Sequence, residues 1–193
     1  EVCEVEMAER HGEYKRNNLD WYVEPSWAVD KLFEHVGFEG KIFDPCCGIG
    51  TIPLAARAAG YVANGSDFVA RASGFGISNF LLDKTERNNI VFNPPFAPAQ
   101  QFIEKALTNV RPFGKVVAFV QCKFLYSQGR HKLFSRPEMH SIVVLSRRPS
   151  VPPGEFLLEH GEAGRKGGSI DFCWVIWQRD RLAGQLAKIV WAL

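Results

Sequence analysis

Apolar residues along the chain follow two patterns, one typical of buried strands and one typical of helices. Short, continuous runs rich in Val, Ile and Phe predict strands at residues 41–44, 61–67, 77–82, 88–92, 115–121, 140–146 and 171–177. Between these runs, apolar residues recur every three or four positions and predict helices at 26–36, 51–59, 97–110 and 125–134. Strands that alternate with helices and are apolar on both faces predict an α/β fold around a parallel sheet.

Three of the predicted strands end next to a polar side chain. Asp44 ends the first strand, Asp67 ends the second, and Asn93 directly follows the fourth. Open parallel sheets bind ligands in the crevice outside the carboxyl ends of their strands. We therefore expect these three side chains to gather at one edge of the sheet and to mark a site there.

The composition is that of an ordinary globular protein. The chain has 193 residues, 46% hydrophobic and 23% charged, with a formal net charge of +2, so it fits one domain and neither requires nor excludes a polyanionic partner. Five cysteines without CxxC spacing favour reduced thiols over a disulfide framework or a zinc site. The sequence shows no signal-peptide core and no run of membrane-spanning length. We expect a cytoplasmic protein with no membrane partner and a polar N-terminal arm at residues 1–18.

The segment NNIVFNPPF, from Asn88 to Phe96, places two prolines where a buried strand ends. Proline cannot donate to a sheet ladder, so Pro94 and Pro95 must terminate the strand. The residue before each proline is also driven away from helical angles. The result is a stiff, extended loop that holds Asn93 and Phe96 at the mouth of the sheet.

The segment FDPCCGIGT predicts a tight loop that a ligand can approach closely. Gly48 and Gly50 remove side chains where the chain turns from a strand into a helix. A dinucleotide-binding GxGxxG loop is one alternative, but Pro53 stands at its third glycine and Asp44 would repel a pyrophosphate. The same acid attracts an ammonium group, so the loop favours a cationic amino-acid moiety. A plain strand-to-helix turn is the other alternative.

DPCCGIGT after a strand, an acid ending the next strand, and NPPF after strand four together resemble the class I S-adenosylmethionine-dependent methyltransferases. More narrowly, they resemble the small bacterial or phage N6-adenine DNA methyltransferases, as do the later segments RRPSVPPG and GGSIDFCWVIW. The resemblance covers residues 22–177. It implies a Rossmann-like fold with a mostly parallel seven-stranded sheet, an antiparallel last strand and helices on both faces. It also implies a single methyltransferase domain over residues 1–193.

The resemblance further implies S-adenosyl-L-methionine as the cofactor. Asp44 would lie near its methionine amino group, Asp67 would accept the ribose hydroxyls, and Asn79 replaces an acid that usually faces the adenine. Tyr22, Glu24 and Pro25 match the family's lead segment, which lies over the methionine end. The implied cofactor-binding residues are Tyr22, Asp44, Cys46, Gly48, Gly50, Asp67 and Asn79.

The NPPF segment carries the catalytic hypothesis. An exocyclic amine shares its lone pair with the ring and is a poor nucleophile. The side-chain oxygen of Asn93 and the carbonyl of Pro94 would accept its two N–H groups and aim the lone pair at the methyl carbon, while Phe96 stacks on a flipped base. The implied catalytic residues are Asn93, Pro94, Pro95 and Phe96, and no metal is required.

Cys46 and Cys47 suggest a metal site or a nucleophile as an alternative. Adjacent cysteines do not both ligate a metal easily, and no set of Cys and His partners stands nearby in the sequence. We interpret the pair as small, soft residues that line a pocket.

Basic residues follow two strand ends and predict contact with nucleic acid. The substrate-binding candidates are Lys123, Arg130, Arg147 and Arg148, although such charge clusters are often only solvated surface. A recognition region would fall within residues 123–168, which is too short for a separate sequence-reading domain, so a partner or second subunit is expected to assist. DNA is preferred over RNA as the substrate. Cytosine N4, RNA adenine, protein glutamine and a non-catalytic cofactor-binding subunit remain alternatives.

Overall fold

The computed structural model describes residues 20–182 and 184–193, so the predicted N-terminal arm lies outside the described residues. Five α-helices lie within the described ranges: α1 (Ser26–His35), α2 (Thr51–Ala58), α3 (Ala99–Asn109), α4 (His131–Phe134) and α5 (Gly154–His160). Four 3-10 turns accompany them: η1 (Phe80–Leu82), η2 (Cys122–Leu125), η3 (Gln128–Arg130) and η4 (Glu162–Gly164).

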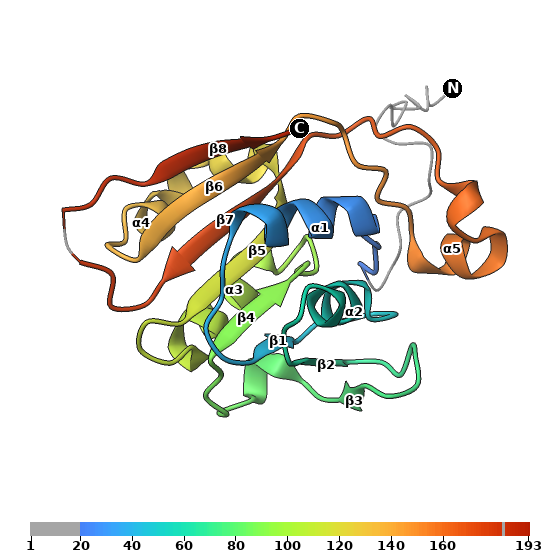
Figure 1. Ribbon diagram of the computed structural model, residues 1–193, viewed down its shortest axis with the longest axis horizontal. Coiled ribbons are helices and arrows are strands. Elements are labelled where there is room, and N and C mark those ends of the chain that lie inside the picture. Colours follow the sequence, from blue (N-terminus) through green and yellow to red (C-terminus); the bar gives the residue numbers. More distant parts are fainter. Residues whose placement is uncertain (1–19, 183) are drawn as a thin grey trace, which may run out of the picture.

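The described strands form one eight-stranded sheet in the order β3-β2-β1-β4-β5-β7-β6-β8 (Figure 1). The strands are β1 (Ile42–Asp44), β2 (Ala63–Asp67), β3 (Gly76–Ile77), β4 (Asn89–Phe92), β5 (Lys115–Gln121), β6 (Met139–Leu145), β7 (Phe172–Gln178) and β8 (Lys188–Ala192). Each neighbouring pair is parallel except the two pairs that contain β7. The structure thus confirms the mostly parallel α/β sheet with one reversed strand.

The sheet has one strand more than the sequence predicts. β7 is the antiparallel strand, but it is not the last, because β8 follows it and pairs in parallel with β6, Ile189 opposite Ile142. β8 lies at the sheet edge, where Ile189 and Trp191 are exposed although apolar. An edge strand with apolar residues facing solvent lacks the alternation that marks a half-buried strand.

Two predicted elements are shorter than expected. Of the segment 77–82 only Ile77 belongs to β3, which pairs with β2, because the Asn79 side chain then accepts a hydrogen bond from the backbone N–H of Leu81 and starts η1. Such local side-chain bonds compete with a sheet ladder. In the segment 125–134, only α4 is α-helical and η3 precedes it.

Helices cover both faces of the sheet, as predicted. α1 and α2 pack on the face that presents Phe119 and Trp174, and α3 and α4 pack on the face that presents Val175 and Trp177 (Figure 1). Both tryptophans are fully buried, and the indole N–H of Trp174 donates to the backbone oxygen of Ala28 at 2.8 Å. A buried indole needs such a partner, so this bond fixes α1 against the sheet.

No helix within the described residues is long and apolar enough to cross a membrane. The cytoplasmic location stays a prediction.

Candidate active site at the carboxyl ends of the strands

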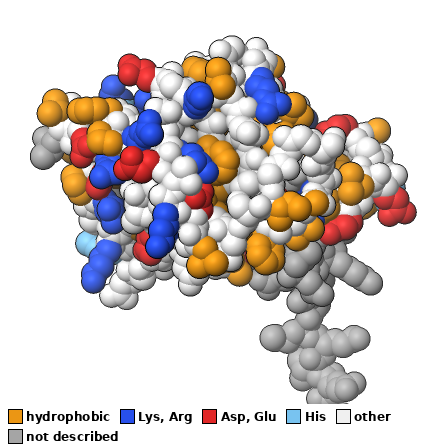
Figure 2. Space-filling view, turned by 90° about the horizontal axis from the view of Figure 1, so that it is seen from below, with side chains coloured by type: hydrophobic (Ala, Val, Ile, Leu, Met, Phe, Trp, Pro, Cys, Tyr) orange, Lys and Arg blue, Asp and Glu red, His pale blue; other side chains and the backbone are white. Residues whose placement is uncertain are grey.

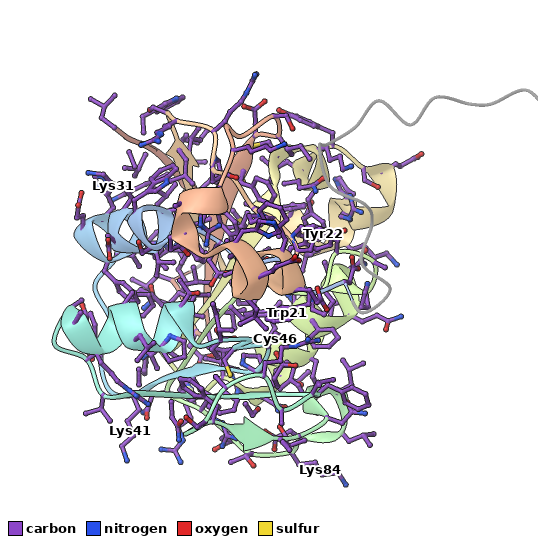
Figure 3. The ribbon with its side chains drawn as sticks, turned by 90° about the vertical axis from the view of Figure 1, so that its right-hand side faces the viewer. Trp21, Tyr22, Lys31, Lys41, Cys46 and Lys84 are labelled. Atoms are coloured by element: carbon purple, nitrogen blue, oxygen red, sulfur yellow. The ribbon has the colours of Figure 1, made fainter. Side chains whose placement is uncertain are left out.

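The structure brings the three predicted polar strand ends to one edge of the sheet. β1 lies between β2 and β4 and is parallel to both, so Asp44, Asp67 and Asn93 all lie at the carboxyl edge. Figure 3 faces the side of the molecule where α5 lies, and the labelled Trp21, Tyr22 and Cys46 lie near its centre.

Two acids shape the glycine loop between β1 and α2. The Asp44 carboxylate accepts the backbone N–H of Cys46 at 2.9 Å, and the Asp67 carboxylate accepts the N–H of Gly48 at 2.9 Å. Gly48 and Gly50 have φ angles of 52° and 91°, in the left-handed region that side chains disfavour. The loop therefore requires glycine at both positions and presents its backbone closely to the site.

Asp67 has several partners within the chain. Its carboxylate also accepts the backbone N–H of Val69 at 3.1 Å and lies 3.5 Å from Nε of Arg71. The Arg71 guanidinium in turn lies 4.0 Å from the ring centre of Trp21, whose indole packs directly against Gly48. Asp67 thus holds the glycine loop in place, a role the sequence does not indicate, and its binding of ribose stays a prediction.

Two carboxyl groups of the site are almost fully buried. Asp44 is 1% exposed and Glu24 is 6% exposed. Burial raises the pKa of Asp44 well above its ordinary value, and the nearby charges of Glu24 and Asp67 raise it further. The hydrogen bond from Cys46 lowers this pKa but does not offset the effect of burial. Burial also raises the pKa of Glu24. Such a cluster of desolvated acids is stabilised by a cationic ligand.

Asn93 has a side-chain oxygen without a hydrogen-bond partner. Its amide nitrogen donates to the backbone oxygen of Tyr22 at 2.9 Å and to the Glu24 carboxylate at 2.8 Å. Its Oδ1 is buried and accepts no bond from the described residues. A buried acceptor normally has a partner, so this oxygen is set up to accept an N–H from a ligand.

The ring of Phe96 stacks on the ring of Tyr22, with a centroid distance of 4.9 Å and an interplanar angle of 18°. Stacked rings lie about 4.5 Å or more apart, so no third ring fits between these two. A base that stacks here must use the outer part of the pair or separate it. The backbone N–H of Ala97 donates to Asp20 at 2.7 Å and fixes the same loop.

The lead segment before α1 lies against the loop before α5. The N–H of Val23 donates to the carbonyl of Pro152, and the N–H of Gly154 donates to the carbonyl of Trp21, both at 3.0 Å. Arg165 donates to the carbonyl of Val23 at 2.8 Å and to that of Glu24 at 3.2 Å. These contacts, which place Glu24 beside Asn93, join residues more than a hundred positions apart.

The other predicted cofactor residues show mixed surroundings. Asn79 is exposed and its side chain caps η1. Cys46 is partly buried, and burial raises the pKa of its thiol well above the ordinary value, with Asp44 adding to the effect. A thiol that stays protonated is a poor nucleophile, so this agrees with a small residue that lines a pocket.

The predicted substrate cations follow the ends of β5 and β6, but three of the four have partners within the chain. The Arg130 guanidinium lies 4.1 Å from the ring centre of Phe124 and donates to the carbonyl of that residue. Arg147 lies over Trp27, and Arg148 pairs with Asp171 at 2.7 Å in an exposed salt bridge. Exposed ion pairs contribute little to stability and exchange readily.

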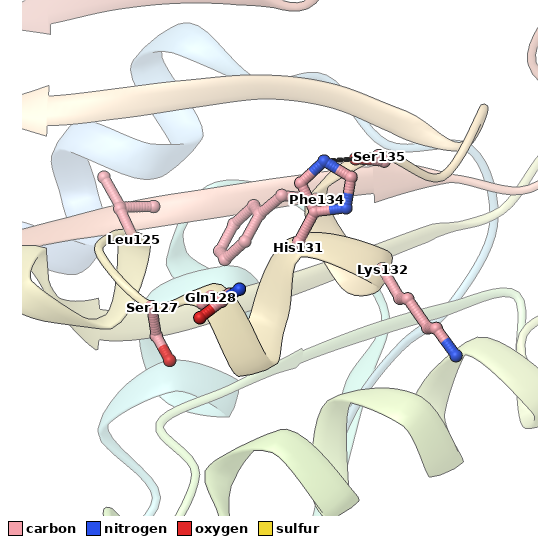
Figure 4. A pocket seen from close by; sticks show the side chains of 7 residues that line it. All are labelled: Leu125, Ser127, Gln128, His131, Lys132, Phe134 and Ser135. Carbon is pink, nitrogen blue, oxygen red and sulfur yellow. Dashed lines mark hydrogen bonds between the residues drawn. The ribbon is translucent and has the colours of Figure 1, made fainter.

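A hollow of about 540 Å³ lies beside α4, within the predicted recognition region (Figure 4). Two of the side chains that line it are apolar and the others are polar or basic. The lining residues are Leu125, Ser127, Gln128, His131, Lys132, Phe134 and Ser135. Seen from below, Lys and Arg side chains gather on the left part of the surface, and few lie on the right (Figure 2). On this face the basic side chains are therefore concentrated in one region, although the formal net charge of the chain is only +2.

No protein-family model matches the chain, and no curated protein matches it. Solved structures do share its fold. The M protein of the type I restriction enzyme EcoKI superposes with a TM-score of 0.58 at 13% identity, over 83% of this chain and 44% of that protein. A Listeria monocytogenes protein, provisionally assigned to the class I S-adenosylmethionine-dependent methyltransferases, superposes with a TM-score of 0.57 at 13% identity. The match covers 86% of this chain and 62% of that protein.

A provisionally assigned RNA methyltransferase from Pyrococcus horikoshii gives a TM-score of 0.56 at 14% identity, over 88% of this chain and 93% of that one. The chain spans less than two thirds of the EcoKI and Listeria proteins. The similarities establish the fold, which is that of the class I S-adenosylmethionine-dependent methyltransferases, as predicted.

Proposed function

We propose that the protein is an S-adenosylmethionine-dependent N-methyltransferase that acts on the exocyclic N6 amine of adenine in nucleic acid, with DNA preferred. The buried, unpartnered Oδ1 of Asn93 at the end of β4 is the observation that carries the proposal. An amide oxygen held in this way is suited to accept an N–H from a planar, conjugated amine.

The residues of the site fit the cofactor. The buried acids Asp44 and Glu24 suit its cationic methionine end, and the glycine loop lets a ligand approach the backbone of Gly48 and Gly50. In this proposal Tyr22, Cys46, Asp67 and Asn79 line the remainder of the pocket. When bound, the cofactor supplies an activated methyl group on a sulfonium.

The chain itself contributes position and electrostatics. Oδ1 of Asn93 and the carbonyl of Pro94 accept the two N–H groups of the amine, which turns its lone pair toward the methyl donor. Pro95 keeps the loop extended, and Phe96 with Tyr22 offers an aromatic surface for the base. A base within a duplex must first be flipped out.

The choice of nucleic acid as the substrate is supported by the structural neighbours and by the exposed cations of residues 123–168. The similarity to the EcoKI M protein supports DNA, and the similarity to the Pyrococcus protein keeps RNA as the alternative. In the proposal, residues 123–168 contact phosphates through Lys123, Arg130, Arg147 and Arg148, and a partner subunit supplies most of the sequence recognition. Incubation with labelled S-adenosylmethionine and separate DNA, RNA and protein pools, followed by mass spectrometry, tests this. Label on DNA adenine supports the proposal, and label only on RNA, cytosine or glutamine overturns its substrate assignment.

We expect cofactor affinity to rise with pH. The pKa of Asp44 is raised in the free protein, so below that pKa the carboxyl is neutral and a cationic ligand must displace its proton. Affinity therefore falls by up to about tenfold per pH unit below the raised pKa and levels off above it. Isothermal titration calorimetry from about pH 5 to about pH 8 measures this dependence. An equally steep pH dependence in Asp44→Asn would contradict the assignment to this acid.

We expect Lys123→Glu to weaken nucleic-acid binding. Lys123 is exposed after β5, at the carboxyl edge, so its reversal removes a phosphate contact and adds repulsion. Affinity should fall about tenfold, and the slope of log affinity against log salt should decrease by about one. Lys41→Glu is the matched control, because Lys41 is exposed just before β1, at the opposite edge. Equal losses for the two variants would indicate a nonspecific charge effect. Fluorescence anisotropy with a labelled duplex provides the measurement.

A further inference from the structure

Glu24 is a buried acid whose carboxylate lies beside the side chain of Asn93. Its carboxylate accepts a hydrogen bond from Nδ2 of Asn93 at 2.8 Å, and the residue is 6% exposed. Burying an ionisable group has a large cost unless a specific interaction offsets it. A buried glutamate that does not pack the core and faces the site therefore calls for a role in the site.

The contact determines which way the Asn93 amide points. A flipped amide would place its oxygen against the backbone carbonyl of Tyr22, which is an acceptor in every state, and against the Glu24 carboxylate. With both N–H bonds directed to these two acceptors, Oδ1 is left for the ligand, and it is the atom without a partner. Two oxygens on the lead segment thus select one of two otherwise equivalent orientations.

Glu24 is itself held firmly. Arg165 donates to the carbonyls of Val23, Ser150 and Glu24, and its side chain is only 10% exposed. The same guanidinium is bound by both carboxylate oxygens of Glu162. The lead segment therefore cannot rotate freely, and the carboxylate of Glu24 stays beside the amide.

We propose that Glu24 is a positioning residue, which holds the Asn93 amide with its oxygen toward the substrate amine. The inference rests on the proposed function. A carboxylate that accepts the amide N–H also draws electron density toward Oδ1, because linked hydrogen bonds polarise one another. Glu24 therefore both orients this oxygen and makes it a better acceptor for the amine N–H.

Three variants separate this role from a simple charge effect on the cofactor. Glu24→Gln removes the charge but keeps an acceptor oxygen, Glu24→Ala removes both, and Glu34→Gln changes an exposed acid of α1 as the control. Both Glu24 variants should lose cofactor affinity to a similar extent, since both lose the charge. In contrast, kcat should fall about tenfold to a hundredfold in Glu24→Ala and recover most of that loss in Glu24→Gln.

The side-chain amide signals of Asn93 in ¹⁵N–¹H NMR spectra give a readout that does not depend on activity. They are assigned by their loss in Asn93→Ala. We expect one N–H proton to shift and to exchange faster in Glu24→Ala, to shift less in Glu24→Gln, and not to change in Glu34→Gln, with folding checked by thermal unfolding.

Unchanged Asn93 amide signals in Glu24→Ala overturn the proposal, whatever the activity. A shifted signal with wild-type kcat also overturns it, because the orientation would then have no catalytic effect. If the wild-type protein transfers no methyl group while the NMR signals respond as expected, the contact stands, but the proposed function fails and the positioning role fails with it.

Discussion

Replacing Asn93 with alanine is expected to lower methyl transfer about 10²–10³-fold and to leave cofactor affinity nearly unchanged. The substitution removes the one buried side-chain acceptor at the end of β4 that has no partner in the described part of the chain. Loss of a preorganised hydrogen-bonding group in an active site typically lowers kcat about 10²–10³-fold. Single-turnover transfer and calorimetric titration of the cofactor together measure both quantities.

Asn88→Ala is the matched control for this experiment. Asn88 directly precedes β4, at the amino end of the strand and therefore at the opposite edge of the sheet. We expect this variant to retain wild-type turnover. Wild-type turnover in Asn93→Ala would show that the catalytic assignment is wrong, and cofactor binding without any turnover in the wild-type protein would favour a non-catalytic subunit.

Replacing Asp44 with asparagine is expected to lower cofactor affinity about a hundredfold while making the ligand-free protein at least as stable. The new side chain keeps an oxygen that can accept the N–H of Cys46, which the carboxylate accepts at 2.9 Å. It removes a charge that burial, Glu24 and Asp67 all disfavour in the free protein. The same charge would stabilise the cationic end of the cofactor, at about 1.4 kcal/mol per tenfold in affinity.

The opposite signs of the two effects make this prediction specific. A variant that merely disturbs the loop would lose both binding and thermal stability. Asp30→Asn, in which the replaced acid is exposed on α1, serves as the control and should change neither quantity. If Asp44→Asn binds the cofactor as tightly as the wild-type protein, the buried acids are not the site of the cationic moiety.

The sequence predicts the sheet because its strands are short, apolar runs between helices with helical periodicity. It fails at β8, where Ile189 and Trp191 face solvent, and at Asn79, where a side-chain hydrogen bond replaces the end of a strand. In both places the outcome depends on a neighbour, not on the local pattern. β8 forms because β6 offers it an edge.

The site shows the same division. Asp44, Asp67 and Asn93 are predictable because each stands at the end of a strand, and parallel strands end together. The contact of Glu24 with Asn93 cannot be predicted from the sequence, because it spans 69 positions. It also depends on a lead segment that Arg165 fixes from 141 positions away. The one sequence signal for this contact is that Glu24 directly precedes Pro25 in a segment that resembles the family's lead segment.

The most direct test of the central claim compares the wild-type protein with Asn93→Ala, using labelled S-adenosylmethionine and duplex DNA. The DNA is digested to nucleosides, and the labelled nucleoside is identified by mass spectrometry. The account predicts N6-methyladenine from the wild-type protein and about 10²–10³-fold slower formation of it by the variant, with the cofactor bound equally by both. Equal label from both proteins, or no label in any nucleoside from a wild-type protein that binds the cofactor, would contradict it.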